Sequence, residues 1–435
     1  MTRRRARIAF FSPLPPAMSG IADYAIDVLA MIEDRFEIDV YCAQDRVDRT
    51  RLPKGCTLYP ARHAADKHKK EPYDLGLFQL GNSVDHAFMY EHLPHMPALV
   101  VLHDLVLHHS RAQMLLDTRE ARAYAADPSS PALRDAVMKN IGLYREELAY
   151  SYPEQARRLG DVQLETVGKL LPYAYPLFRI PVETARLTVV HNAYCADAIL
   201  NELPDAMTAI VPMCAEPLPA TQEQVDGLRQ RYKIAPDEFV VASFGLITRE
   251  KGIGTVAQAA ARARARLERL RLLFVGAVPD TVELYTALER VGMSDNAVVT
   301  HRVPFRELGA HMQLAELAIH LRYPTARETS AALLRLLAQG RPTVMSDVEN
   351  MAMIPGDAVV RASPTDEEGD VTRAILRLAE RPERRAALSH AATRYAREEH
   401  SFERCQSAYI DAIEHALALP DPPIRPWPAH WQHTA

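Results

Sequence analysis

Short apolar runs alternate with amphipathic stretches along the N-terminal half of the chain. Residues 8–11 form a continuous apolar run, which is typical of a strand buried on both faces. After a proline-rich break, apolar side chains recur at helical spacing from Ile21 to Ile32, and Ser19 is a suitable N-cap for that helix. Together, these patterns predict a mostly parallel sheet covered by helices. The other strand-like runs of this half are residues 36–42, 75–80, 98–102 and 187–191.

One stretch departs from this alternation, and a second series follows it. Residues from about 111 to 171 are charged and helical in pattern, so we interpret them as a helical insertion. Prolines cluster at residues 204–219, which marks a linker. A new alternating series starts at residues 239–245, and an amphipathic helix is predicted at residues 402–417. The later strand-like runs are residues 272–275, 297–300, 317–321 and 342–345.

The pattern therefore predicts an α/β protein with two doubly wound, Rossmann-like domains. We expect an N-terminal domain over residues 1–203 that carries the helical insertion, and a C-terminal domain over residues 220–400. A final helix and tail occupy residues 401–435. The length of 435 residues fits two or three domains at ~150 residues each.

Composition and charge exclude several classes of protein. The chain is 48% hydrophobic and 25% charged, which excludes wholesale disorder. Its net charge of −5 gives no general attraction to nucleic acid or to anionic membranes. The 5 cysteines are scattered without a C-x-x-C motif, so neither a disulfide framework nor a metal cluster is expected. No apolar run approaches the ~18–20 residues that span a bilayer, and we expect a cytoplasmic protein.

The loops that follow the predicted strands are the first candidates for a site, because open α/β sheets bind ligands there. The loop over residues 12–20 is stiffened by prolines and leads into a helix N-terminus, which suits an anion. Gly20 permits a close approach to the backbone. The loop lacks the G-x-G-x-x-G fingerprint, so a dinucleotide site is weakly supported. A proline-rich loop that merely closes a strand–helix unit is the structural alternative.

A second loop, FGLITREKG at residues 244–252, combines two cations with two glycines. Arg249 and Lys251 are placed to neutralise a diphosphate, and Gly245 and Gly252 permit close backbone approach. Either cation alone is more usually a solvated surface charge.

A third loop, LRYPTARETS, precedes a predicted helix. It holds Arg322, Arg327 and Glu328, and a buried carboxylate at Glu328 would accept hydrogen bonds from substrate hydroxyls. Alternatively, Thr329 and Ser330 cap the helix while Glu328 favours its positive end. Both interpretations stay open at this point.

A fourth loop places His103 and Asp104 at the end of the strand over residues 98–102. An imidazole there can position a reacting hydroxyl or stabilise developing charge. Lone histidines are more often structural, and the histidines of this loop do not form a metal-ligand set, so no metal is expected.

Taken together, these loops resemble the GT-B glycosyltransferases of family 4, retaining enzymes that use nucleotide-activated sugars. The resemblance implies an acceptor-binding N-terminal domain, a donor-binding C-terminal domain facing it across a cleft, and a last helix that crosses back to the N-terminal domain. The matching segments, in the family's order, are residues 12–24, 78–82, 101–104, 189–192, 244–252, 321–330 and 340–342.

The resemblance also implies a role for individual residues. Lys251 would contact the donor diphosphate, Glu328 the hydroxyls of the donor sugar, and His103 would lie near the transferring sugar. His103 and Glu328 are therefore the predicted catalytic residues. The other predicted donor-binding residues are Gly20, Gly245, Arg249, Arg322, Thr329 and Ser330, and the predicted acceptor-side residues are Asn82, His86 and Asp104.

The chain departs from the family's pattern at the positions that matter most for the donor. Leu246 stands where the family commonly has an arginine, so Arg249 is expected to substitute. Arg327 and Arg335 occupy the positions of the two family glutamates, with Glu328 one place late. Because the second glutamate holds the ribose in that family, the resemblance implies altered nucleotide binding.

The sequence favours a retaining hexosyltransferase that needs no cofactor or metal and moves a sugar from a nucleotide-sugar to a carbohydrate or lipid-linked acceptor. One alternative is a non-catalytic GT-B-fold binding or partner subunit, and a nucleotide-dependent oxidoreductase is less favoured without G-x-G-x-x-G. A series of arginines leaves open a peripheral contact with anionic lipid at the inner membrane face. A solvated basic helix face is the preferred interpretation of the same series. That series, assigned to one helix, is Arg262, Arg264, Arg266, Arg269 and Arg271.

Overall fold

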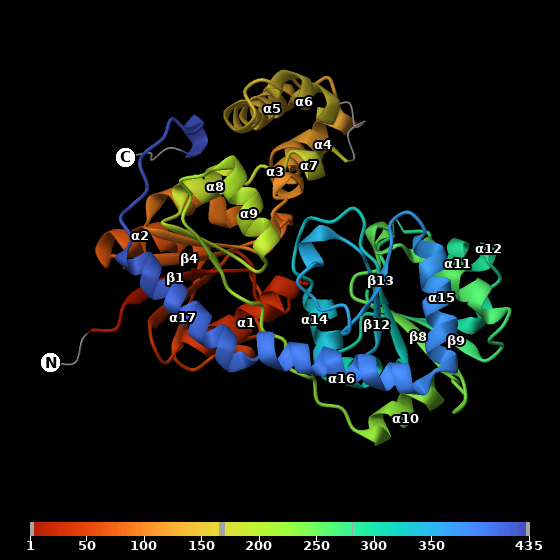
Figure 1. Ribbon diagram of the computed structural model, residues 1–435. Helices are drawn as coiled ribbons and strands as arrows, with labels where there is room; N and C mark the ends of the chain where they lie inside the picture. The colour runs from red at the N-terminus through yellow and green to blue at the C-terminus, as the bar shows by residue number, and fades with distance from the viewer. Residues whose placement is uncertain (1–3, 165–169, 281, 432–435) are drawn as a thin grey trace. The chain divides into compact units, whose positions relative to one another are not determined.

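The chain divides into two compact units, each a parallel sheet flanked by helices (Figure 1). The computed structural model describes residues 4–164, 170–280 and 282–431. The first unit comprises residues up to Pro212, the short segment Ala326–Thr329, and the chain from Cys405 onward. The second unit comprises Met213–Thr325 and Ser330–Arg404. The predicted fold of two doubly wound, Rossmann-like domains is confirmed.

The first unit contains a seven-stranded parallel sheet in the order β3-β2-β1-β4-β5-β6-β7. Its inner strands are apolar on both faces, as in β5, where every side chain is buried. The strands are β1 Arg7–Phe11, β2 Glu37–Cys42, β3 Cys56–Pro60, β4 Leu75–Leu80, β5 Ala98–Leu102, β6 Leu187–Val190 and β7 Thr208–Ile210.

Two strands of this sheet were not predicted, and both lie at its edges. The strand β3 has no fully buried residue, and β7 has only three residues, none of them buried. The stretch 204–219, predicted as a linker, contains β7, and the boundary between the two units falls after it, at Pro212. Half-exposed edge strands lack the continuous apolar run that identifies a central strand.

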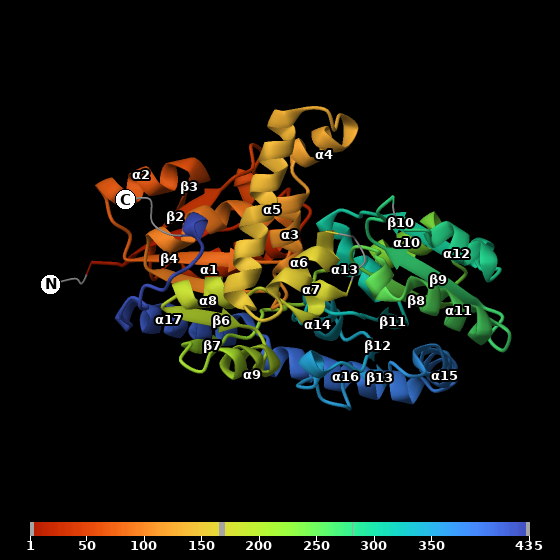
Figure 2. The same ribbon diagram turned by 90° about the horizontal axis from the view of Figure 1, so that it is seen from above.

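The predicted helical insertion lies between β5 and β6 along the chain, and it has an apolar cluster of its own. Figure 2 shows the helices of this insertion grouped together. Tyr144 and Leu148 of its longest helix are fully buried in that cluster. The insertion helices are α3 His108–Leu116, α4 Arg119–Ala126, α5 Pro131–Ser151, α6 Ala156–Leu164 and α7 Leu171–Ala174. The other helices of the unit are α1 Gly20–Ile32, α2 Ala64–Lys70, α8 Arg179–Thr184, α9 Ala193–Glu202 and most of α17 Phe402–Ala418.

The C-terminal helix α17 packs on the first unit. The ring of Tyr409 lies 6.4 Å from that of Tyr24 on α1, and Gln406 Nε2 donates to the carbonyl of Met31 at 2.9 Å. The predicted helix over residues 402–417 is thus confirmed to within one residue.

The tail beyond α17 is also anchored in the first unit, through a buried carboxylate. Glu147 of α5 accepts hydrogen bonds from Trp431 Nε1 at 2.8 Å, from His430 Nε2 at 2.7 Å and from the Arg111 guanidinium. Burial alone would raise the pKa of Glu147, but the Arg111 charge and these hydrogen bonds lower it to about 2. The carboxylate is therefore charged inside the protein.

The second unit contains a six-stranded parallel sheet in the order β10-β9-β8-β11-β12-β13, with an apolar cluster on each face. Its edge strand β13 was not predicted, for the same reason as β3 and β7. The strands are β8 Phe239–Phe244, β9 Leu270–Val275, β10 Ala297–His301, β11 Leu317–His320, β12 Thr343–Ser346 and β13 Val360–Ala362. The helices are α10 Gln222–Arg231, α11 Ile253–Arg264, α12 Leu284–Arg290, α13 Phe305–Leu314, α14 Ala331–Ala338, α15 Glu367–Glu380 and α16 Pro382–Glu399.

The assignment of the arginine series to one helix is wrong. The helix α11 ends at Arg264, Arg269 follows it, and Arg271 lies within β9. A strand begins at Leu270 because an apolar run resumes there after a short turn. Arg271 pairs with Glu238 at 2.9 Å. These arginines therefore do not form a single basic helix face.

Candidate functional site

The loop over residues 244–252 places a buried lysine at the carboxyl end of β8. Lys251 ends the short 3₁₀ helix Arg249–Lys251, and its side chain turns back so that Nζ donates to the carbonyl of Phe244. Gly245 has a φ of 95° and lies against this ammonium group, where a β-carbon would collide with Nζ. The glycine therefore makes room for a cation that is only 5% exposed.

The same loop delivers the chain into helix α11 through a second glycine. Gly252 has a φ of 60°, and it occupies the N-cap position without a side chain to cap the first turn. A β-carbon at Gly252 would lie 3.0 Å from Leu321 Cδ1. Free amide groups at a helix N-terminus favour a bound anion, so this turn reinforces the charge of Lys251.

The loop after β11 is fixed against the loop that carries Lys251. Tyr323 N donates to the carbonyl of Glu250 at 2.8 Å, and Arg322 N donates to Ser346 Oγ at 2.9 Å. Arg322 is half-buried and Arg249 is exposed. The second unit thus brings Arg249, Lys251 and Arg322 to neighbouring strand ends, as the sequence predicts for a donor site.

His320 also belongs to this cluster, and the sequence interpretation missed it. It is the last residue of β11 and is 3% exposed. Burial, and then the charges of Lys251 and Arg322, lower the pKa of His320 well below its ordinary value. The imidazole is therefore neutral. Its position at the end of a predicted strand was the available signal.

Glu328 lies on the four-residue segment Ala326–Thr329, which belongs to the first unit. The carbonyl of Ala326 accepts hydrogen bonds from Leu105 N at 3.1 Å and Val106 N at 3.2 Å, directly after the His103–Asp104 loop. Glu328 is 8% exposed. The expectation of a buried carboxylate at this position is confirmed. Ala326, two residues before Glu328, is hydrogen-bonded to the loop that follows β5.

Thr329 and Ser330 have different roles in the structure. Ser330 is the N-cap of α14, with Leu333 N donating to its Oγ at 3.4 Å. Thr329 Oγ1 instead accepts from Asn192 Nδ2 at 3.0 Å. The capping interpretation is therefore right for Ser330 and wrong for Thr329, because Asn192, the N-cap of α9, holds the threonine.

His103 is part of a buried chain of hydrogen bonds. His103 Nε2 lies 2.6 Å from Gln79 Oε1, His103 Nδ1 lies 3.1 Å from His191 Nε2, and His191 Nδ1 lies 2.8 Å from the carbonyl of Val211. Burial, and then the neighbouring His191 and His86, lower the pKa of His103 well below its ordinary value. Both ring nitrogens of this neutral imidazole are engaged within the protein.

The donors and acceptors along this series of hydrogen bonds determine the orientation of the Gln79 amide. His191 Nδ1 carries a hydrogen because it faces a carbonyl, and in the neutral imidazole His191 Nε2 then accepts from His103 Nδ1. His103 Nε2 is then an acceptor and needs a donor. The buried amide nitrogen of Gln79 has no hydrogen-bond partner among the residues that the structure describes, and it supplies that donor once the amide is turned. The sequence interpretation assigned no role to Gln79 or His191.

Two of the predicted acceptor-side residues are bound to each other. Asn82 N donates to Asp104 Oδ2 at 2.8 Å, and Asn82 Oδ1 accepts from Ser110 N at 3.2 Å. His86 is 1% exposed, and its Nδ1 lies 2.9 Å from the carbonyl of Gln79. Internal hydrogen bonds therefore use these polar atoms of Asn82 and His86. By contrast, Gly20 at the start of α1 is exposed, and a β-carbon there meets no atom within 4 Å.

Neutral histidines in the first unit predict acid-sensitive stability. Burial lowers the pKa of His86, His92 and His108 from 6.5 to about 4. Between those values the unfolded chain binds protons that the folded chain excludes, so stability falls as the pH falls. We expect the urea midpoint of unfolding, measured by tryptophan fluorescence, to be lower at pH 5 than at pH 7.5. His108→Gln should flatten this dependence and exposed His415→Gln should not; a midpoint unchanged across the range contradicts the assignment.

Membrane-spanning helices and metal-ligand clusters were both sought in the described residues. In the described residues, no helix is long and apolar enough to cross a membrane. Across residues 4–164, 170–280 and 282–431, no group of three His, Cys, Asp or Glu side chains is arranged to hold a metal ion.

Fold and loop geometry together define the class of architecture as GT-B, the two-domain fold of many glycosyltransferases. HepE of Anabaena in complex with UDP-glucose superposes with a TM-score of 0.66 at 12% identity, over 94% of this chain and 99% of that chain. Sucrose-phosphate synthase of Thermosynechococcus elongatus gives 0.66 at 15% identity, over 95% and 100%. WaaG, a glycosyltransferase involved in lipopolysaccharide biosynthesis, gives 0.62 at 14% identity, over 93% and 99%. At these identities the likeness establishes the fold.

The second unit adds a likeness in sequence. Residues 238–381 match the family model of glycosyl transferases group 1. No match to the chain is found among curated proteins. The matched segment includes the loop with Lys251 and the loop with Glu328, so the resemblance of these motifs to glycosyltransferases is confirmed there.

Proposed function

We propose that the protein transfers a sugar from a nucleotide-sugar to a carbohydrate or lipid-linked acceptor, with retention of configuration and without a metal. The observation that carries this proposal is the buried Lys251 ammonium at the end of β8, inside the segment that matches glycosyl transferases group 1. The carbonyl of Phe244 holds this ammonium group at the end of the strand, where it would stabilise the charge of a departing diphosphate.

The proposed chemistry follows from the charges at the strand ends. When the bond from the sugar to the nucleoside diphosphate breaks, negative charge develops on the leaving phosphate. Lys251, Arg249 and the first turn of α11 would stabilise that charge. Glu328 would accept hydrogen bonds from the sugar hydroxyls, and the neutral His103 would be held in one orientation by Gln79.

Calorimetric titration with UDP, GDP, ADP and dTDP tests the donor site. We expect selective binding of one diphosphate by the wild type and its loss in Lys251→Ala, because the lysine contributes a charge-assisted contact to phosphate. Arg262→Ala is the matched control, since Arg262 is 67% exposed and pairs with Glu368 on the outside of the unit. Absence of binding to all four nucleotides would overturn the proposal.

A non-catalytic binding subunit is the second candidate, and Arg335 favours it. This residue occupies the position of a family glutamate, and its guanidinium lies 5.2 Å from the centre of the Phe305 ring. The side chain is thereby used in packing against α13.

Glu328→Gln separates the two candidates. For an enzyme, we expect this change to remove transfer and donor hydrolysis at an unchanged melting temperature, because the amide keeps the shape and loses the charge. Glu383→Gln, an exposed change on α16, is the control. Absence of both transfer and donor hydrolysis in the wild type as well as in Glu328→Gln would favour the non-catalytic subunit.

A further inference from the structure

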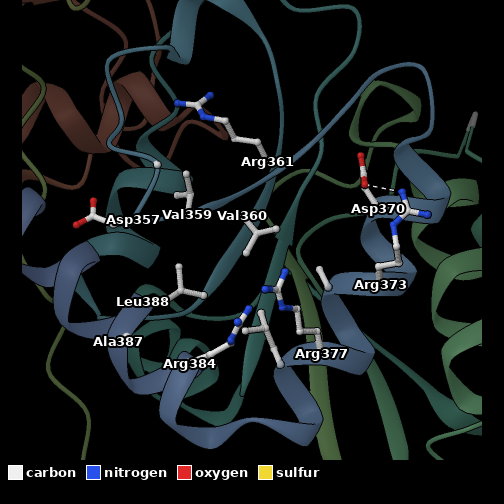
Figure 3. A pocket seen from close by; sticks show the side chains of 13 residues that line it. Asp357, Val359, Val360, Arg361, Asp370, Arg373, Arg377, Arg384, Ala387 and Leu388 are labelled. Carbon is white, nitrogen blue, oxygen red and sulfur yellow. Dashed lines mark hydrogen bonds and ion pairs between the residues drawn. The ribbon is translucent and has the colours of Figure 1, made fainter.

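A hollow lies at the β13 edge of the second unit (Figure 3). It has a volume of about 590 Å³, and its walls come from β13 and the residues before it, from α15 and from the first turns of α16. This volume falls within the range of ~300–1,000 Å³ that is typical of small-molecule sites. None of its lining residues belongs to the loops over residues 244–252 and 321–330.

Two of the four arginines that line the hollow are already neutralised. Arg361 pairs with Asp347 at 3.1 Å and donates to the carbonyl of Ile354 at 2.7 Å. Arg373 pairs with Asp370 at 2.6 Å. These two side chains therefore serve the structure of the unit.

The other two arginines have no such partner. For Arg377 on α15 and Arg384 on α16, the described part of the chain provides neither an ion pair nor a side-chain hydrogen bond. Figure 3 shows both side chains extending into the hollow toward one another from the two helices. The two acidic residues of the lining are engaged elsewhere, since Asp357 pairs with Arg394 at 3.0 Å and Asp370 with Arg373. Two converging guanidinium groups repel each other until an anion lies between them.

The floor of the hollow limits the size and shape of that anion. Val360, Ala374, Leu378 and Leu388 give it an apolar surface, and Ala374 and Leu378 are buried. A free phosphate ion would fill only a small part of about 590 Å³. An anion joined to an apolar or ring-shaped body fits both features.

We propose that this hollow binds the phosphate monoester of a small organic molecule. Arg377 and Arg384 bind the phosphate, and the organic part contacts the apolar floor. Arginine forks match phosphate oxygens in a bidentate manner, and two of them suit the double charge of a phosphate monoester. The site is separate from the proposed donor site and does not depend on it.

Calorimetric titration with phenyl phosphate and with inorganic phosphate tests the proposal. The wild type should bind phenyl phosphate more tightly than inorganic phosphate because only the former covers the floor. The double variant R377A/R384A should lose affinity for phenyl phosphate by about tenfold or more. R397A removes an exposed arginine of α16 outside the hollow and should bind as the wild type does. K251A should also keep this affinity, which distinguishes the hollow from the donor site.

Sedimentation with phosphatidylcholine vesicles, with and without phosphatidic acid, distinguishes a soluble phosphate monoester from a lipid headgroup. Pelleting that requires both phosphatidic acid and the two arginines would identify the lipid as the source, and no pelleting would identify a soluble ligand. Failure of the wild type to bind either phenyl phosphate or phosphatidic acid would overturn the proposal. Equal affinity of the wild type and a folded R377A/R384A would also overturn it.

Discussion

Replacing Lys251 with alanine is expected to lower the turnover of sugar transfer by about 10²–10³-fold, the usual cost of removing one preorganised donor to developing charge. The lysine is held by the carbonyl of Phe244 and by the space that Gly245 leaves, so its charge is in position before the donor binds. A steady-state assay with the nucleotide chosen by calorimetry measures the effect.

Two controls separate this effect from a loss of structure. Lys251→Arg keeps a positive charge and should retain part of the turnover, although the longer fork must fit beside Gly245. Arg262→Ala removes an exposed cation from the following helix and should leave turnover unchanged. Wild-type turnover in a correctly folded Lys251→Ala protein would show that the buried cation has only a structural role.

Replacing Arg111 with alanine is expected to destabilise the first unit by about 3–5 kcal/mol, which is typical of breaking a buried ion pair from one side. The side chains of Arg111 and Glu147 are 3% and 2% exposed. The change would remove the charge that lowers the pKa of Glu147 in the wild type and would leave a buried carboxyl group without its cation. Its remaining partners, Trp431 and His430, do not replace the guanidinium charge.

Urea unfolding, monitored by tryptophan fluorescence, measures this loss of stability in the first unit. The protein has 2 tryptophans, Trp427 and Trp431, and both are buried in the first unit. Arg122→Ala removes an exposed arginine of the same insertion and should not move the midpoint. Arg111→Met with Glu147→Leu should recover part of the stability. An unchanged midpoint in Arg111→Ala would show that the pair contributes nothing to the fold.

The inner strands could be predicted from the sequence because burial on both faces leaves a continuous apolar run. Residues 75–80 and 98–102, for example, coincide with β4 and β5. The strands β3, β7 and β13 escaped because they lack a continuous apolar run, whereas β10, also at an edge, keeps one at residues 297–299 and was predicted. Which strands pair, and in which register, also depends on the folded chain and could not be predicted from the sequence.

Some features of the candidate site could likewise be predicted from the sequence, and others could not. The loop with Lys251 could be predicted because glycines and cations after a strand form a local pattern. The partners of His103 could not, since Gln79 and His191 lie 24 and 88 residues away along the chain. The hydrogen bond of Thr329 to Asn192 spans 137 residues. Local patterns thus predict which loops carry the site, and packing decides which atoms remain available in them.

The assignment of Cys405–Ala435 to the first unit has a consequence for how the protein is made. During synthesis a domain usually folds once its last residue has left the ribosome. Here Tyr409 and the anchoring Trp431 emerge only after the whole second unit has been translated. The part of the protein that starts first is therefore the part that is completed last, and a premature stop before α17 would leave its hydrophobic interior open to chaperones and proteases.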